Sequence, residues 1–157
     1  MIVSGPPAVY PWPIGAGPRY HPPALRRDGR PVRELRCASG RTIAVHLELF
    51  AKKRVVVVPR GIGVAKSCTY PVATTEPTGV LHVRGRRTLG DLFAVWGTRL
   101  GTNRLLSFPG RVSVYVGGRP FTGDPRSVPL HRHAEIVVEV DGHVAPHPSY
   151  LFPKGVG

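Results

Sequence analysis

Prolines and glycines interrupt this chain at short intervals along its whole length. The sequence holds 18 Pro and 19 Gly among 157 residues. Because proline lacks a backbone N–H and fixes φ, and because glycine favours turns, these residues exclude long uninterrupted helices. We therefore expect one domain of short strands and many turns, with extensions at its ends.

The prolines are densest at the start of the chain, where residues 1–40 are expected to form an extended arm. Missing backbone donors should keep this segment out of a central sheet, so that it runs over the surface or in solvent. The aromatic residues Tyr10, Trp12 and Tyr20 could dock the arm onto its own domain or onto a partner, and its own domain is the simpler hypothesis. Five arginines follow the prolines: Arg26, Arg27, Arg30, Arg33 and Arg36.

Alternating apolar residues predict several strands after the arm. Residues 43–50 have the period of two that is typical of a strand with one buried face, and Lys52 and Lys53 turn the chain into the apolar run 55–58 to complete a hairpin. A short strand is expected at 80–83. Later strands are expected at 112–116 and 136–140, with a Gly117-Gly118 hairpin turn that leads to a short return strand at Phe121 and then a turn at 123–126.

One helix is predicted between Thr88 and Gly97. Thr88 is a favourable N-cap, Asp91 suits the positive end of the helix dipole, and Gly97 suits the C-terminal stop. Four apolar residues recur at helical spacing and should pack on a sheet: Leu89, Leu92, Phe93 and Trp96.

The order of these elements predicts an α+β fold in which a mixed sheet packs on a single main helix. This order and the segment VSVYVGGRPFTGDPRSVPLHRHAEIVVEV resemble the ubiquitin-like β-grasp, in which a hairpin, a helix and further strands enclose that helix. The predicted domain covers residues 41–142, and residues 143–157 form a Pro-rich C-terminal tail.

The balance of charge favours an acidic partner. The chain has 22 Lys and Arg against 9 Asp and Glu, a formal net charge of +13, and such a surface attracts polyanions. Arg84, Arg86 and Arg87 directly precede the helix start, where free backbone N–H groups also favour anions, so they form a predicted anion-binding site. A solvated basic loop is the alternative, and arginine-rich composition is also typical of a GC-rich genome.

Several segments suggest a metal site that has lost ligands. HLELF, VPRGIGV, FAVWG, VYVGGRPFTGDPRSVPL and YLFPKG are similar to segments of a poorly characterised bacterial family that is often membrane-anchored. That resemblance implies a Cys, then His-x-His-Asp, then Gly and another His, a set that could hold Cu or Zn. Cys68, Gly79 and His82 match this pattern, whereas Ala73, Thr75 and Glu76 stand at the two His positions and the Asp position. Cys68 and His82 therefore remain as weak metal candidates.

A second His-x-His pair, His131 and His133, offers two possible ligands. Two imidazoles on one strand face are too few for a metal site, so a solvated strand entrance is the preferred interpretation.

The cysteines and the apolar runs bear on the compartment. Cys37 and Cys68 allow one disulfide at most, and we expect free thiols in a reducing compartment. No apolar run is long enough for a transmembrane helix, and the first residues lack signal-peptide features. The chain as written is therefore predicted to be cytoplasmic, or extracytoplasmic if an upstream anchor or signal is missing from it.

No catalytic motif is present: we find neither a nucleophile elbow nor a phosphate-binding loop. We predict a non-enzymatic binding or adaptor module, without a cofactor, whose basic surface meets nucleic acid or an acidic protein. Two alternatives remain open: a degenerate member of a metal-handling extracytoplasmic family, and a structural subunit of a larger assembly.

Overall fold

The computed structural model describes residues 5–13, 17–24, 37–65 and 68–157. The arginine-rich part of the predicted arm, residues 25–36, lies outside the described residues. Within them, a seven-stranded mixed sheet and a single α-helix establish an α+β architecture.

The main sheet is built around two long parallel neighbours, β2 (Ile43–Ala51) and β10 (Glu135–Val140). On the far side of β2 lie β3 (Arg54–Val56) and β5 (Val80–Val83), both antiparallel to it, followed by β4 (Val72–Ala73). On the far side of β10 lie β8 (Val112–Val116) and then β9 (Arg119–Phe121), again antiparallel. Two smaller ladders join β1 (Ala8–Val9) to β11 (Tyr150–Leu151) and β6 (Arg104–Leu105) to β7 (Phe108–Pro109).

The predicted hairpins and their turns are confirmed. Lys52 and Lys53 connect β2 to β3 with φ of 53° and 66°, and Gly117 and Gly118 connect β8 to β9 with φ of 61° and 78°. Two consecutive positive φ values give the turn a twist that matches paired strands, which explains the two glycines. The predicted turn at 123–126 overlaps a short 3₁₀ helix, η1 (Pro125–Ser127).

The helix prediction is also confirmed: α1 (Leu89–Trp96) begins after Thr88 and ends at Gly97, whose φ is 82°. The backbone N–H of Thr88 donates to Asp91 Oδ2 over 2.9 Å. All four predicted apolar residues of α1 are buried against one face of the sheet, which we call the inner face. No helix in the described part of the chain is long and apolar enough to cross a membrane.

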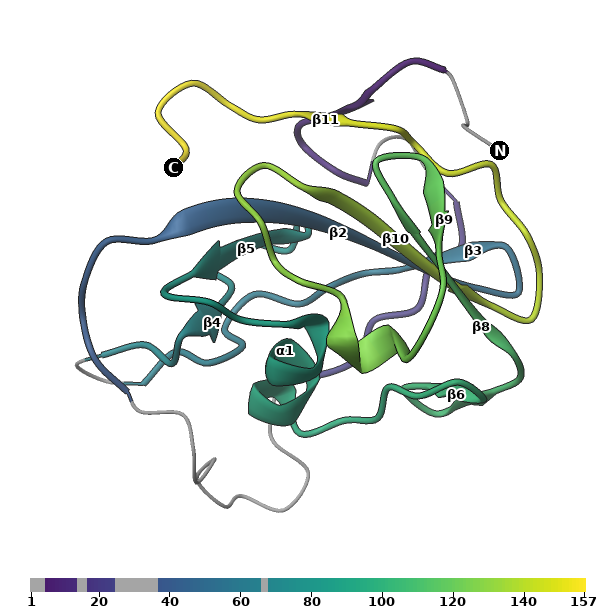
Figure 1. Ribbon diagram of the computed structural model, residues 1–157, viewed down its shortest axis with the longest axis horizontal. Helices are drawn as coiled ribbons and strands as arrows, with labels where there is room; N and C mark the ends of the chain where they lie inside the picture. The colour runs from purple at the N-terminus through teal and green to yellow at the C-terminus, as the bar shows by residue number, and fades with distance from the viewer. Residues whose placement is uncertain (1–4, 14–16, 25–36, 66–67) are drawn as a thin grey trace.

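The opposite face of the sheet, the outer face, is covered by both ends of the chain. Figure 1 shows α1 on one side of β2, with β11 and the first part of the N-terminal segment on the other. A small apolar cluster fills this space, made by Ala8, Ala44, Val80 and Tyr150 with Trp12, Phe152 and Val156 packed against it. The expectation of a strand with only one buried face was therefore wrong for β2, because the terminal segments bury its second face as well.

The described part of the arm docks onto its own domain, as the simpler hypothesis predicted. Trp96 Nε1–H donates to the carbonyl of Pro23 over 2.8 Å. Tyr20 even reaches the edge of the main sheet, where its N–H donates to Val55 O over 3.0 Å and its carbonyl accepts from Val57 N–H over 2.9 Å. Tyr20 lies between Pro18 and Pro22 but keeps its own backbone N–H, so the arm can form one sheet bridge there.

Candidate metal centre

A cluster of ionisable side chains is buried on the outer face, at the centre of the sheet. His46 and Glu48 lie two positions apart on β2, so their side chains share a face, and Glu135 opposes His46 in the parallel ladder with β10. Their relative exposures are 0%, 0% and 2%. One potential ligand atom from each of the three lies within 4.8 Å of the other two.

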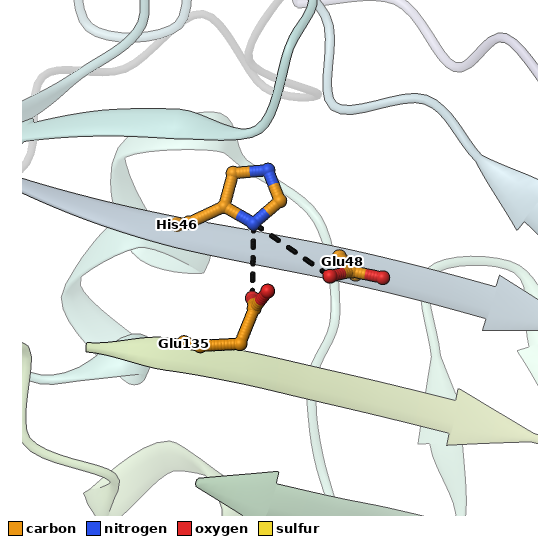
Figure 2. A group of neighbouring side chains, drawn as sticks. All are labelled: His46, Glu48 and Glu135. Atoms are coloured by element: carbon orange, nitrogen blue, oxygen red, sulfur yellow. Dashed lines mark hydrogen bonds and ion pairs between the residues drawn. The ribbon is translucent and has the colours of Figure 1, made fainter. Parts of the chain in front are cut away.

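We call His46, Glu48 and Glu135 the candidate metal centre, and their donor atoms converge on one another (Figure 2). His46 Nδ1 lies 2.9 Å from Glu135 Oε1 and 3.7 Å from Glu48 Oε2. The second oxygen of Glu135, Oε2, is buried without a hydrogen-bond partner. Buried carboxylate oxygens are nearly always paired, so this oxygen is available to a ligand.

The orientation of His46 is fixed by the loop before β5. Its Nε2 lies 2.9 Å from the carbonyl of Thr78, which can only accept, so Nε2 carries the proton and Nδ1 faces the two glutamates. This contact needs Gly79, whose φ is 80° and where an added Cβ would lie 2.2 Å from Leu47 O and 3.1 Å from His46 Nε2. A glycine there lets the backbone come close enough to hold the imidazole.

Burial sets the protonation states of the cluster. Loss of solvent lowers the pKa of His46 to about 3, so its ring is neutral and Nδ1 carries a lone pair. Burial, and then the neighbouring carboxylate of Glu48, raises the pKa of Glu135 far above its ordinary value. Without an ion, Glu135 therefore holds a proton that it donates to His46 Nδ1.

The terminal segments close the metal centre from outside. The ring of Tyr150 stacks on His46 with centroids 3.6 Å apart and an interplanar angle of 3°. The ring of Trp12 meets His46 edge-on at 6.2 Å and His147 edge-on at 5.4 Å. His147 Nδ1 lies 2.8 Å from Glu48 Oε1 and 3.1 Å from Glu48 Oε2. His46 thus contacts both chain ends and the loop before β5, and Glu48 contacts the C-terminal segment.

The structure places the two metal candidates from the sequence in different environments. Cys68 is joined to Cys37 in a disulfide, which corrects the expectation of free thiols and removes Cys68 as a thiolate ligand. His82 pairs with Ala73 across β4 and β5, and its Nε2 lies 3.3 Å from Thr75 Oγ1. Positions 73, 75 and 82 therefore do meet in space, but they contribute a single imidazole.

His82 borders a cavity of about 260 Å³ between β5 and the chain ends, lined by Tyr10, Thr75, Glu76, Val80, His82, Pro153 and Val156. Partial burial lowers the pKa of His82. The hydroxyl of Tyr10 donates to both oxygens of Glu76, over 3.1 Å and 3.2 Å. Glu76 is thus engaged with the N-terminal segment.

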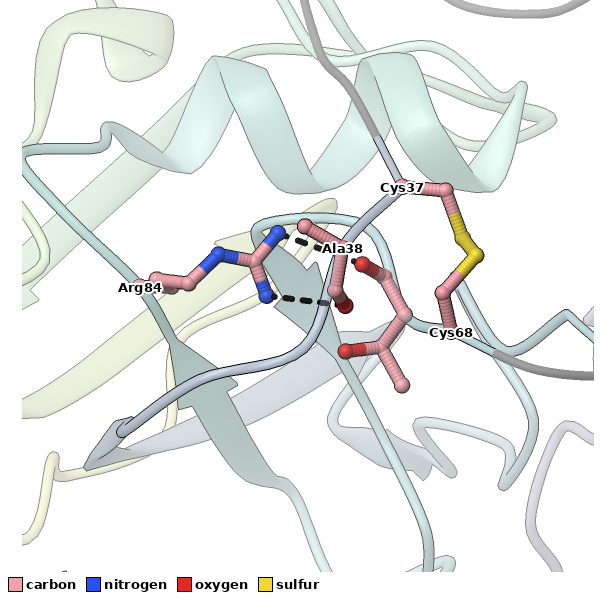
Figure 3. Close-up of a disulfide and its surroundings, with 5 residues drawn as sticks. Cys37, Ala38, Cys68 and Arg84 are labelled. Carbon is pink, nitrogen blue, oxygen red and sulfur yellow. Dashed lines mark hydrogen bonds between the residues drawn. A yellow bond between two sulfur atoms is a disulfide. The ribbon is translucent and has the colours of Figure 1, made fainter.

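The three arginines of the predicted anion site differ in their surroundings. The guanidinium of Arg84 donates to the carbonyls of Ala38 and Thr69, over 3.4 Å and 3.2 Å, and so joins the two segments that carry the disulfide (Figure 3). Arg87 Nε donates to the Arg84 carbonyl over 3.4 Å, whereas Arg86 is exposed. At the helix start itself, Leu89 N–H already donates to Val128 O over 2.8 Å.

The His-x-His pair lies in the turn before β10 and not on a strand. His133 has a φ of 60° and its ring stacks on Phe152 with centroids 4.3 Å apart, while His131 is exposed. Both residues are therefore outside the metal centre.

Sequence reasoning missed His46, Glu48 and Glu135, although one signal was present. In HLELF a histidine and a glutamate occupy alternate positions of an apolar strand, which places two ionisable groups on one face. The pairing of β2 with β10, which adds Glu135, joins residues far apart in the sequence. Comparison with family models, with curated proteins and with solved structures gives no match.

Proposed function

We propose that this protein is a non-enzymatic metal-binding module that holds one borderline divalent ion, Zn²⁺ or Cu²⁺, at His46, Glu48 and Glu135. The observation that carries this proposal is the convergence of three buried donor atoms, one imidazole nitrogen and two carboxylates, beside the unpartnered Glu135 Oε2. Imidazole together with carboxylate is a donor set that suits zinc and copper.

The distances between donors support the same conclusion. A tetrahedral ion with ligand bonds of about 2.0 Å has ligand atoms about 3.3 Å apart. The two separations from His46 Nδ1, 2.9 Å and 3.7 Å, lie on either side of that value. An ion can therefore replace the proton on Glu135 with small movements of the side chains.

The disulfide favours an oxidising compartment for this function. Disulfides persist in secreted and periplasmic proteins and are rare in the cytosol. The bond between Cys37 and Cys68 therefore supports the extracytoplasmic alternative over the cytoplasmic one. We propose that the chain is a divergent member of the metal-handling family that its sequence resembles, with a metal centre other than the one at Cys68 and His82.

The order of elements supports a β-grasp-like topology. The hairpin β2–β3, the helix α1 and the later strands β8 to β10 form one sheet that packs on a single helix, with β2 parallel to β10. Such a scaffold carries many unrelated functions, so it adds nothing to the choice of ligand.

The test is a titration of the metal-stripped full chain with Zn²⁺, followed by calorimetry. We expect one equivalent to bind to the wild-type protein and at least a tenfold loss of affinity in Glu135→Gln. Glu139→Gln is the matched control, since Glu139 is buried on the same strand but bonds to His143 and Val144 instead of the cluster. Absence of stoichiometric binding, or equal loss in both variants, contradicts the proposal.

A second candidate function rests on the charge of +13. We propose that the basic surface, with Arg86 exposed at the loop before α1, meets an acidic partner such as nucleic acid. Binding to a short RNA or DNA should weaken steeply with salt and should weaken in Arg86→Ala. Arg111→Ala is the control, because it also removes one positive charge but does so next to β8, away from the loop before α1. If neither salt nor Arg86→Ala alters binding, this second candidate is excluded.

A further inference from the structure

The two chain ends form a cover over the metal centre that we call the terminal strap, defined as residues 8–12 and 147–152. Its halves are held to each other by the parallel ladder between β1 and β11, and Ala8 N–H donates to Ser149 O over 2.8 Å. Its contacts with the metal centre are made by side chains: Trp12, His147 and Tyr150.

His147 links the strap to the metal centre directly. Its ring lies in the C-terminal segment, yet its Nδ1 reaches both oxygens of the fully buried Glu48. A carboxylate can only accept, so the imidazole donates its Nδ1–H to Glu48. Hydrogen bonds of this kind orient a ligating carboxylate and typically contribute a factor of about 10 to 100 in metal affinity.

We propose that the terminal strap is a metal-responsive lid, and that His147 is the positioning residue that couples strap docking to ion binding through Glu48. This inference rests on the proposed metal-binding function. With the strap docked, Glu48 is held toward His46 and Glu135; with the strap lifted, Glu48 loses its donor and the aromatic cover of His46 is removed. By linkage, the factor by which docking strengthens ion binding equals the factor by which the ion strengthens docking.

The terminal strap also lies over the imidazole of His46, which the ion must reach. Tyr150 stacks on one face of His46, and Trp12 meets its edge. Since the metal centre is fully buried, an ion enters only when the strap lifts, so association should be slow compared with an open site.

The experiment uses the full chain with Zn²⁺ alone, and measures both affinity and backbone hydrogen exchange. Zn²⁺ should slow exchange of the strap amides at 8–10 and 149–152 by the same factor by which strap docking strengthens Zn²⁺ binding. His147→Ala should weaken Zn²⁺ binding by about 10-fold to 100-fold. His147→Asn should recover most of the affinity, because its amide N–H can donate from nearly the same position.

His143→Ala is the matched control, because His143 lies four residues earlier in the same C-terminal segment and pairs with Glu139, outside the metal centre. Trp12→Ala should raise the Zn²⁺ association rate while Glu135 remains required for binding. Unchanged affinity in His147→Ala, together with strap exchange that Zn²⁺ does not slow, overturns the lid while leaving the metal site in place. If the wild-type protein binds no Zn²⁺, both the proposed function and the proposed lid are contradicted. That outcome is distinguishable from the previous one, in which Zn²⁺ binds but the strap does not respond.

Discussion

The two faces of the same sheet are buried in opposite ways. On the inner face, β2 contributes Val45, Leu47 and Leu49, which belong to the same apolar cluster as the buried side chains of α1. On the outer face, one residue further along the same strand, β2 contributes His46 and Glu48. Both faces are closed to solvent, but the inner one is closed by a helix and the outer one by the chain ends.

The two faces differ in what it costs to bury them. Burying apolar area is favourable in itself, at about 25 cal/mol per Å². Burying two carboxylates and an imidazole is unfavourable unless each finds a partner, and replacing such groups with apolar residues is often neutral or stabilising. The outer face keeps these three groups buried under the chain ends, so each of them depends on its polar contacts in a way that no residue of the apolar cluster does.

The largest expected change in stability comes from substituting the tryptophans, because the described chain has one on each face of the sheet. Trp96→Ala on the inner face should lower the free energy of unfolding by about 3 to 5 kcal/mol, since the side chain is only 1% exposed and leaves a cavity. Trp12→Ala on the outer face should have a clearly smaller effect, because that side chain is partly exposed. Urea denaturation measures both, and equal losses contradict a division of roles between the faces.

The disulfide provides the next test, because it stabilises the chain without touching either cluster. Cys37 and Cys68 are separated by 31 positions, and closing such a loop contributes about 3 to 4 kcal/mol through the unfolded state. The double variant Cys37→Ser/Cys68→Ser should lose about that much stability in thermal or urea unfolding. Its affinity for Zn²⁺ should stay within about twofold of the wild type, and a collapse of affinity would show that the metal centre depends on global stability.

Gly79→Ala should lower both the stability of the fold and the affinity for Zn²⁺. The loss of stability should be smaller than in the two preceding tests. The new methyl group meets the Leu47 carbonyl, and the φ of 80° is unfavourable for alanine. We expect a loss of about 2 kcal/mol. The His46 Nε2 contact with Thr78 should also weaken, so metal affinity falls as well. Gly85→Ala is the control, since its φ of 78° is similar but its nearest contacts are at 3.9 Å. Equal behaviour of the two variants contradicts a specific role for Gly79.

The last test is a pH dependence that the ionisable groups of the outer face should produce. His46 has a folded pKa below its ordinary 6.5, so its contribution to stability is lost as pH falls below about 6.5. Glu135 has a folded pKa above its ordinary 4.5, so its contribution is lost as pH rises above about 4.5. Between these values the two effects oppose each other, and the metal-free protein should be most stable there.

Outside that window, stability should change by at most about 1.4 kcal/mol per pH unit for each group. Glu135→Gln should remove the decline on the alkaline side while leaving the decline on the acid side. Unfolding measured in a chelator between pH 4 and pH 9 checks this. A profile that is unchanged by Glu135→Gln would falsify the assignment of a proton to this carboxyl.

The sequence predicts the inner face far better than the outer one. The signals for α1 and for the hairpin turns are local: Thr88, Gly97 and the Gly117-Gly118 pair each act within a few residues. The outer face depends on contacts between distant segments. No sequence pattern near His46 predicts that it will lie opposite Glu135. In the same way, no pattern near His147 predicts its contact with Glu48, 99 positions away.

The ladder between β1 and β11 is also not predicted from the sequence, for a similar reason. Ala8 and Val9 stand between prolines, and two-residue strands have too few residues to show a period of two. Two cysteines allow one disulfide at most, but the sequence alone does not show that it forms. Their pairing depends on the fold, because only the folded chain brings residues 31 positions apart to a Cα separation of 5.5 Å.

The parallel ladder of β2 and β10 also shapes how this chain folds. Its partners His46 and Glu135 are 89 positions apart, so a long loop must close before the centre of the sheet exists. Loop closure of this kind opposes early pairing, and proteins dominated by such distant contacts fold in milliseconds to seconds. His46, Glu48 and Glu135 therefore come together only at the step that closes the sheet, and a nascent chain that stops before β10 lacks the candidate metal centre.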